Sequence, residues 1–324
     1  MKNKVIQPTR RHFLGLGGAA LLAPGMAWAN GVETISGAAF GTTWHLAGPS
    51  GRGLPQLRPA IEAAFGEVDR QMSPWRGDSE ISGFNAGPEG GHRVSSDTAR
   101  VAAASLALAQ ESGGRFDPTV GPLVARWGFG PISGSGPDWR GLAVEQNTIV
   151  KHTAGLTLDL CGIAKGWALD RAVRLARVAG HEDLLLDLGG ELAAIGTHPA
   201  GRAWRVAVEN PIGGGPAPAV LRLADGQAVA TSGTQAQGYG AGARTYSHII
   251  DPVRQEPTEG ALKSVTVLAP TAMQADGWAT ALFAAGAEAG PALARSRHIA
   301  ALFLVDTPEG PQQLRTGTIE AALI

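Results

Sequence analysis

The chain of 324 residues carries 27 basic and 28 acidic side chains, for a net charge of −1, and 44% of its residues are hydrophobic. This balance gives no electrostatic footprint for nucleic acid or for an anionic membrane surface, and the length allows one large domain or two interlocked lobes. The single cysteine, Cys161, cannot form an internal disulfide, so the fold has to depend on its hydrophobic core.

The first 29 residues have the features of an export signal. A twin-arginine motif, TRRHFLG, occupies residues 9–15, an apolar stretch follows, and the small-x-small sequence AWA precedes residue 30. The apolar stretch is shorter than the ~20 residues that a membrane-spanning helix needs. No cysteine stands at the cleavage site. We therefore predict a signal peptide over residues 1–29 and a soluble periplasmic domain over residues 30–324, without a lipid anchor.

Strands and helices mix along the rest of the chain without strict alternation. Hydrophobic periodicity predicts strands at residues 37–46, 156–160, 184–188, 204–209, 228–231, 246–250, 265–269 and 300–305. It predicts helices at residues 57–70, 97–111, 163–179 and 271–286, with Asp97 and Thr271 as capping residues. Loops are expected at residues 72–85 and 211–218, and an extended segment at 116–123. This order favours an α+β, or mixed α/β, fold over a doubly wound parallel sheet.

An acid and a hydroxyl lie four residues apart on the alanine-rich helix after Thr271. Asp276 and Thr280 would share one face of that helix and present two hard oxygens at one place. Such oxygens suit Mg²⁺ or Ca²⁺ better than zinc. Taken alone, the pair is explained at least as well by a first-turn acid and by a threonine bonded to its own helix.

A strand, a glycine turn and a helix start follow one another at residues 159–166. Helix N-termini bind phosphate groups, and Lys165 in the first turn opposes the helix dipole, which favours an anion nearby. Gly162 lets the backbone approach a ligand or metal closely, or simply turns the chain. The alternative for Lys165 is a solvent-facing lysine on an ordinary helix.

His248 stands between hydroxyl residues and an apolar pair, just before an Asp-Pro turn at Asp251. By itself, a histidine on an apolar strand is more often a satisfied core residue than a catalyst. Asp117 is explained equally well as a turn residue, and Trp75 and Phe116 fit either stacking on an aromatic ligand or packing in the core. Together with the oxygen pair, however, the histidine indicates metal-assisted chemistry on a phosphate.

Taken in order, these segments resemble the ApbE family, the FAD:protein FMN transferases. The matching stretches lie at residues 72–85, 116–123, 127–130, 159–170, 187–191, 230–233, 247–252 and 275–286. Each stretch is weak alone, whereas the ordered set is specific. The resemblance implies an ApbE-like fold with two interlocked lobes around a flavin and metal cleft.

The same resemblance implies an activity and a set of site residues. The expected reaction is the Mg²⁺-dependent transfer of FMN from FAD to a threonine or serine hydroxyl of another protein, forming a phosphoester and releasing AMP. The metal would lie at Asp276, Thr280 and the backbone carbonyl of Gly162, and His248 would act at the acceptor hydroxyl. FAD would bind at or near Phe40, Trp75, Arg115, Phe116, Asp117, Asp159, Lys165 and Ile250.

The chain departs from the family pattern at three positions. Ala279 stands where some members have a further carboxylate ligand, Phe40 where methionine is frequent, and Cys161 where glycine or serine is usual. The twin-arginine signal resembles the NosX-like branch and implies a respiratory membrane protein as acceptor, such as a NosR-like or an Nqr- or Rnf-type subunit. Two alternatives use the same residues: a periplasmic FAD carrier without turnover, and an FAD pyrophosphatase that gives FMN and AMP.

Overall fold

The computed structural model describes residues 31–324, except residues 213–214, 235–237 and 242–243. The predicted signal peptide therefore lies outside the described residues. Within the described part of the chain, none of the helices combines the length and the apolar character needed to cross a membrane.

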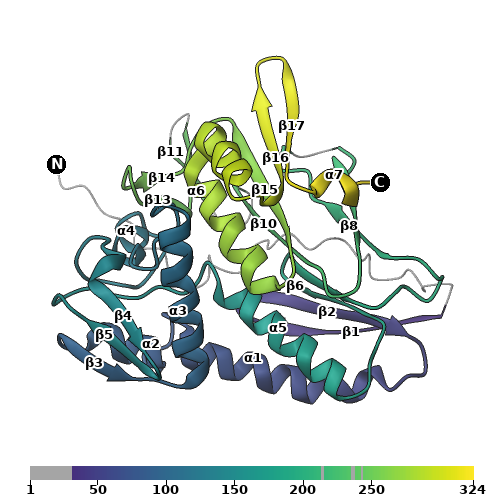
Figure 1. Ribbon diagram of the computed structural model, residues 1–324, viewed down its shortest axis with the longest axis horizontal. Coiled ribbons are helices and arrows are strands. Elements are labelled where there is room, and N and C mark those ends of the chain that lie inside the picture. The colour runs from purple at the N-terminus through teal and green to yellow at the C-terminus, as the bar shows by residue number, and fades with distance from the viewer. Residues whose placement is uncertain (1–30, 213–214, 235–237, 242–243) are drawn as a thin grey trace, which may run out of the picture.

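A large antiparallel sheet forms the centre of the molecule (Figure 1). Among the described residues it has eight strands, in the order β1-β2-β6-β7-β10-β15-β16-β17, and every neighbouring pair is antiparallel. These strands are β1 (Val32–Ala39), β2 (Thr42–Pro49), β6 (Leu184–Leu188), β7 (Glu191–Ile195), β10 (Ala228–Gly233), β15 (Leu262–Ala269), β16 (Ala300–Thr307) and β17 (Gly310–Thr316).

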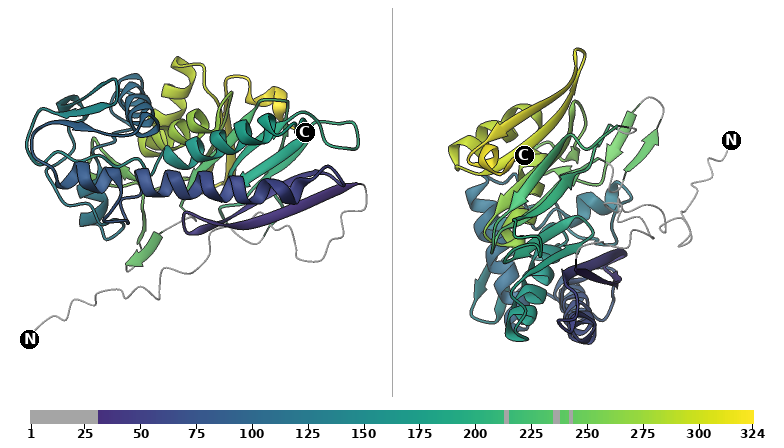
Figure 2. Two further views of the ribbon diagram at one scale, coloured as in Figure 1. Left: turned by 90° about the horizontal axis from the view of Figure 1, so that it is seen from below. Right: turned by 90° about the vertical axis from the view of Figure 1, so that its right-hand side faces the viewer.

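The two faces of this sheet have different covers (Figure 2). One face packs against the helices α1 (Arg58–Met72), α5 (Ala164–Val178) and α6 (Ala272–Ser296). The other packs against the hairpin β8 (Trp204–Val208)–β9 (Ala219–Leu223) and the short helix α7 (Ile319–Ala322). Successive side chains of a strand point to opposite faces, so the inner strands are apolar on both sides.

A smaller lobe is formed by the residues between α1 and α5 and lies at the left of Figure 1. It contains a three-stranded sheet in the order β3-β5-β4. Its elements are α2 (Glu80–Ala86), β3 (Gly90–Arg93), α3 (Ser96–Glu111), α4 (Gly121–Arg126), β4 (Leu142–Glu145) and β5 (Thr148–Lys151). The Asn85 side chain bonds both backbone groups of Leu158 and so joins the end of α2 to the segment that leads into α5.

The remaining elements are short. Two hairpins, β11 (Gly238–Ala241)–β12 (Arg244–Ser247) and β13 (Ile250–Asp251)–β14 (Glu256–Pro257), precede β15. The 3₁₀ turns are η2 (Leu54–Leu57) and η3 (Trp139–Gly141).

The predicted mixed α/β fold is confirmed, but several element boundaries are wrong. The strand predicted at residues 37–46 is a hairpin, because Phe40 and Gly41 turn the chain with φ of 52° and 74°. The loop predicted at residues 72–85 contains α2, whose cap Ser79 accepts a hydrogen bond from the Ser82 N–H. The extended segment predicted at residues 116–123 includes the start of α4.

Other differences concern where elements begin, break or end. The side chain that caps α3 is Ser95, not Asp97. Residues 156–160 form no strand of the described sheets, and the strand predicted at 246–250 breaks between β12 and β13. The last long helix begins at Thr271 as predicted, but it only kinks at Gly286 (φ 80°) and continues to Ser296.

Candidate active site

The N-terminal halves of α5 and α6 run antiparallel and are joined by reciprocal hydrogen bonds. Both carboxylate oxygens of Asp170 accept from the first N–H groups of α6, those of Ala272 (2.8 Å) and Met273 (3.0 Å). In return, Asp276 Oδ2 accepts from the Gly166 N–H of α5 (3.0 Å). Asp170 of α5 pairs with Ala272 of α6, and Gly166, four residues earlier, pairs with Asp276, four residues later. Four further residues in each direction bring Gly162 opposite Thr280.

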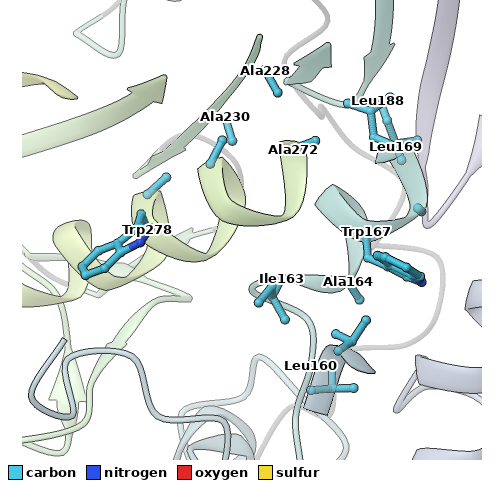
Figure 3. Packing of buried hydrophobic residues seen from close by; sticks show 14 of the residues in the cluster. Leu160, Ile163, Ala164, Trp167, Leu169, Leu188, Ala228, Ala230, Ala272 and Trp278 are labelled. Carbon is cyan, nitrogen blue, oxygen red and sulfur yellow. The ribbon is translucent and has the colours of Figure 1, made fainter. Parts of the chain in front are cut away.

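Gly166 makes this close junction possible. A Cβ at this position would collide with the Ala272 carbonyl and would lie 2.7 Å from the Met273 Cα. Apolar side chains pack beside this junction: Ile163 and Ala164 at the start of α5 belong to the same hydrophobic cluster as Ala272 at the start of α6 (Figure 3). The junction therefore fixes the two helix starts relative to one another.

Hard oxygen atoms from several segments meet beside this junction. Thr280 Oγ1 lies 3.4 Å from the Gly162 carbonyl oxygen and 3.4 Å from Ser232 Oγ of β10. These distances are long for hydrogen bonds, so the oxygens are only weakly engaged with one another. The Asp276 carboxylate projects from the same helix face one turn earlier.

This donor set fits a magnesium ion better than zinc. No group of three or more histidine, cysteine, aspartate or glutamate residues is placed to hold a metal within the described ranges. One carboxylate, one carbonyl and one hydroxyl are instead the oxygen ligands typical of Mg²⁺, which also keeps several waters. The predicted ligands Asp276, Thr280 and Gly162 are thus brought together.

Two buried carboxylates share one ammonium group at the same place. Glu191, the first residue of β7, accepts from Lys165 Nζ at 2.7 Å, and Asp276 interacts with the same lysine over a longer range. Burial raises the pKa of Asp276, and Lys165 opposes this shift. Burial likewise raises the pKa of Glu191 to about 7, with Lys165 opposing and Asp276 adding to the shift.

The lysine responds in the opposite sense. Burial disfavours the charge of Lys165, but Glu191 and Asp276 outweigh burial and raise its pKa. With both carboxylates ionised, the cluster carries a net negative charge in a buried place, which a bound cation would relieve. Glu191 Oε2 is buried and has no hydrogen-bond partner among the described residues, which fits a site that is completed by a further group.

Phe116 forms an aromatic wall beside Gly162. A Cβ on Gly162 would lie 3.2 Å from a Phe116 ring carbon and 3.1 Å from Thr280 Cγ2, so a larger residue would crowd the oxygen cluster. The backbone N–H of Phe116 donates to Ser112 Oγ at the end of α3, which holds the ring in place.

An ion pair connects this wall to the segment that contains His248. Arg115 Nη1 lies 3.4 Å from Asp251 Oδ2, and Asp251 also accepts from the Val253 N–H. The His248 ring packs edge-on against Phe129, with 6.4 Å between ring centroids. Ile250, predicted to contact FAD, is buried in β13 between His248 and Asp251.

Asp117 and Asp159 shape the loops that lead to Gly162. Asp117 Oδ1 accepts from the Thr119 N–H and hydroxyl, and Asp159 Oδ1 accepts from the Cys161 N–H at 3.0 Å. Burial raises the pKa of both carboxyl groups. Their predicted contact with FAD is untested, but their turn geometry alone explains why aspartate suits both positions.

Known proteins resemble this chain over most of its length. The model of the ApbE family matches residues 40–303, more than half of the chain. The chain belongs to the ApbE family. It is 33% identical to an FAD:protein FMN transferase of Vibrio cholerae, over 89% of this chain and 92% of that relative. It is 30% identical to the enzyme of the same name from Escherichia coli K12, over 89% and 87%.

Solved structures of ApbE proteins have the same fold. The flavin transferase ApbE from Vibrio cholerae superimposes with a TM-score of 0.82 at 33% identity, covering 90% of this chain and 99% of that one. The apo form of the flavinyl transferase ApbE from Pseudomonas stutzeri gives 0.81 at 32% identity, covering 90% and 97%. The predicted family and fold are therefore confirmed.

Two residues predicted for the flavin site of this ApbE chain lie outside the contacts described above. Phe40 sits in the turn between β1 and β2 and packs edge-on against Phe65, with 5.9 Å between centroids. Trp75 lies between α1 and α2 with 59% of its surface exposed. Their roles remain predictions.

The structure adds three residues that the sequence had not singled out: Asp170, Glu191 and Ser232. One sequence signal could have identified Glu191, because it follows Gly189 and Gly190, which adopt φ of 66° and 106° and turn the chain sharply. Glycine permits such a tight turn, and the turn sets the direction of the side chain that follows it. The partners of all three residues are distant in sequence and could not be read from spacing.

Proposed function

We propose that this chain is an FAD:protein FMN transferase that modifies a threonine or serine of another protein. The observation that carries the proposal is the junction of α5 and α6, where Asp276, Thr280 and the Gly162 carbonyl meet beside Lys165. The Arg115–Asp251 ion pair ties the segment containing His248 to the aromatic wall of this junction. Phosphoryl transfer requires such positioning and charge neutralisation more than covalent help from the protein.

His248 is the base for the acceptor hydroxyl. An imidazole titrates near neutrality and can take the hydroxyl proton as the oxygen bonds to the flavin-side phosphorus. The bond from that phosphorus to the bridging oxygen breaks, and AMP leaves with the bridging oxygen. Phe116, Arg115 and Ile250 orient the flavin nucleotide in front of His248.

Asp276, Thr280 and the Gly162 carbonyl hold the magnesium ion. When bound, Mg²⁺ neutralises charge on the pyrophosphate. Lys165 supplies a second positive charge at the start of α5, where backbone N–H groups also favour an anion. The raised pKa of Lys165 keeps this charge at neutral pH.

We place the mature domain in the periplasm, after export by the twin-arginine pathway and without a lipid anchor. The acceptor is then a periplasmic domain or a membrane protein with a periplasmic threonine or serine. A respiratory subunit of the NosR-like, Nqr or Rnf type fits this location.

In-gel flavin fluorescence tests the proposal. The mature protein is incubated with FAD, Mg²⁺ and a periplasmic flavoprotein domain carrying an acceptor threonine, and denatured samples are examined beside His248→Ala and the acceptor Thr→Val variant. A fluorescent acceptor band that both substitutions abolish supports the transferase. AMP release without a labelled acceptor points instead to a pyrophosphatase, and tight FAD binding without either product points to a carrier.

A further inference from the structure

Glu191 is a buried charged residue beside the α5–α6 junction that the proposed reaction leaves unused. Its side chain is 4% exposed, one oxygen contacts Lys165 Nζ at 2.7 Å, and the other is buried without a hydrogen-bond partner among the described residues. Burying a carboxylate is costly unless the charge is paired and its oxygens are hydrogen-bonded, and here only one of the two oxygens has a partner in the described part of the chain. Glu191 lies on β7 across from the start of α5, so its backbone is fixed independently of both helices of the junction.

Two carboxylates, those of Glu191 and Asp276, compete for the ammonium group of Lys165. It forms its close ion pair with Glu191, while Asp276 is reached only by a longer-range charge interaction. The lysine side chain is 33% exposed and carries its charge on a long stem with several rotatable bonds, so its ion-pair partner helps to set the position of the ammonium group. Without the Glu191 charge, the ammonium would turn to the remaining buried carboxylate, Asp276, because an unpaired buried carboxylate is unfavourable.

An ammonium group paired with Asp276 would compete with a divalent cation for the same oxygens. We propose that Glu191 is a positioning residue that holds Lys165 away from Asp276 and thereby keeps this carboxylate available to the metal. The inference rests on the proposed metal site at Asp276, Thr280 and Gly162. It assigns Glu191 an effect on metal affinity that passes entirely through Lys165.

A double-mutant cycle on metal binding isolates this effect. Mn²⁺ serves as the probe, with the free ion quantified by electron paramagnetic resonance in the absence of FAD. Mn²⁺ is titrated at pH 8, above the pKa of about 7 of Glu191, so that this carboxylate is ionised. We expect Glu191→Gln to weaken Mn²⁺ binding by about tenfold, a typical coupling between charges in contact. In a Lys165→Met background the same substitution should have no effect, because no ammonium remains to occupy Asp276.

Two controls keep the test specific. Glu67→Gln breaks an equally short ion pair, 2.7 Å to Arg171, outside the junction and should leave Mn²⁺ affinity unchanged. Glu191→Asp keeps the charge on a shorter side chain and should lie between wild type and Glu191→Gln; it also carries the test if the glutamine variant does not fold. Unfolding midpoints are measured for all variants.

The outcomes are distinguishable. Equal weakening by Glu191→Gln in both backgrounds would mean that Glu191 attracts the ion by its own charge, which overturns the inference. Unchanged affinity in the wild-type background also overturns it. If the wild-type protein binds Mn²⁺ no better than Asp276→Ala, the proposed metal site itself is wrong and the role of Glu191 falls with it.

Discussion

Asp276 combines a structural contact with a proposed chemical role. Its carboxylate is buried and accepts from the Gly166 N–H, and burial raises its pKa. Asparagine keeps the shape and one acceptor oxygen but not the charge. We expect Asp276→Asn to unfold at or above the wild-type temperature, because an unfavourable buried charge is removed. Turnover should fall by roughly 100-fold or more, as when one electrostatic group is removed from a reacting charge.

A matched control for this substitution is Asp225→Asn, which neutralises an exposed carboxylate paired with Arg177. Neither stability nor turnover should change by more than a small amount there, because exposed ion pairs contribute little. Differential scanning fluorimetry and the rate of AMP release give the two readouts. An Asp276→Asn protein with wild-type turnover would contradict the assigned role.

Besides its proposed contact with the flavin nucleotide, Arg115 is expected to hold the His248 segment through its ion pair with Asp251. Arg115→Met leaves Asp251 with its backbone donors, Val253 and Arg254, so the stability cost should be only about 1 kcal/mol. The rate of flavin transfer should fall by about tenfold or more, because small misplacements of a reacting group are costly. Urea unfolding and transfer kinetics on the same samples separate the two effects; an equal loss of stability and no loss of rate would argue against this role.

At the scale of elements, the junction of α5 and α6 depends on Gly166. Gly166→Ala adds helix propensity, but its Cβ would collide with the Ala272 carbonyl, so the start of α6 has to shift. We expect a loss of about 1–3 kcal/mol in the free energy of unfolding, the usual cost of overpacking. Reduced metal affinity should accompany it, because Asp276 moves with α6.

Gly66 in α1 provides the contrasting substitution. A Cβ there would meet only the end of the Arg70 side chain, at 3.5 Å. Gly66→Ala should therefore be neutral or stabilise the protein by up to about 1 kcal/mol through helix propensity. Urea titrations of both variants decide the comparison, and similar effects at the two positions would show that the junction is not close-packed.

Signals within a single segment of the sequence predicted the helices that have a clear hydrophobic periodicity. The helix capped by Thr271 was predictable because apolar spacing and a capping hydroxyl lie within one segment. The helix after Gly162 has no side-chain cap among the described residues and was predictable from its apolar spacing alone. The turn at Phe40 was missed because a non-glycine residue with positive φ has no clear sequence signature. The short helix α2 was missed because a helix of 7 residues gives too little periodicity.

The site was predictable only in part. Asp276 and Thr280 could be paired from their spacing, and the resemblance to ApbE proteins supplied Gly162. The contact of Asp276 with Gly166 and of Lys165 with Glu191 joins residues far apart in the chain. Such contacts follow from the packing of α5, α6 and the sheet, which periodicity does not encode.

At the scale of the whole molecule, buried acids should make the metal-free protein less stable as pH rises. Burial raises the pKa of six carboxyl groups, those of Asp117, Asp159, Asp170, Asp187, Glu191 and Asp276. An acid with a raised folded-state pKa stabilises the fold below its unfolded pKa and loses that contribution as pH rises through the folded value. For Glu191 this window runs from 4.5 to about 7.

We therefore expect the unfolding temperature to fall between about pH 5 and pH 7.5, and Glu191→Gln to flatten this slope. Burial lowers the pKa of His198, which acts in the opposite sense but equally in both proteins, so the difference between them reports Glu191. Fluorimetry across this range without added metal is the measurement. Parallel slopes for wild type and variant would contradict the assigned ionisation.

Covalent labelling of an acceptor is the central claim for the whole molecule. The most direct measurement is intact-mass spectrometry of an acceptor domain after incubation with the mature protein, FAD and Mg²⁺, with AMP quantified by chromatography in the same sample. The account predicts that the acceptor gains the mass of one FMN less one water, with one AMP released for each acceptor labelled. An acceptor of unchanged mass, with or without AMP release, would contradict it.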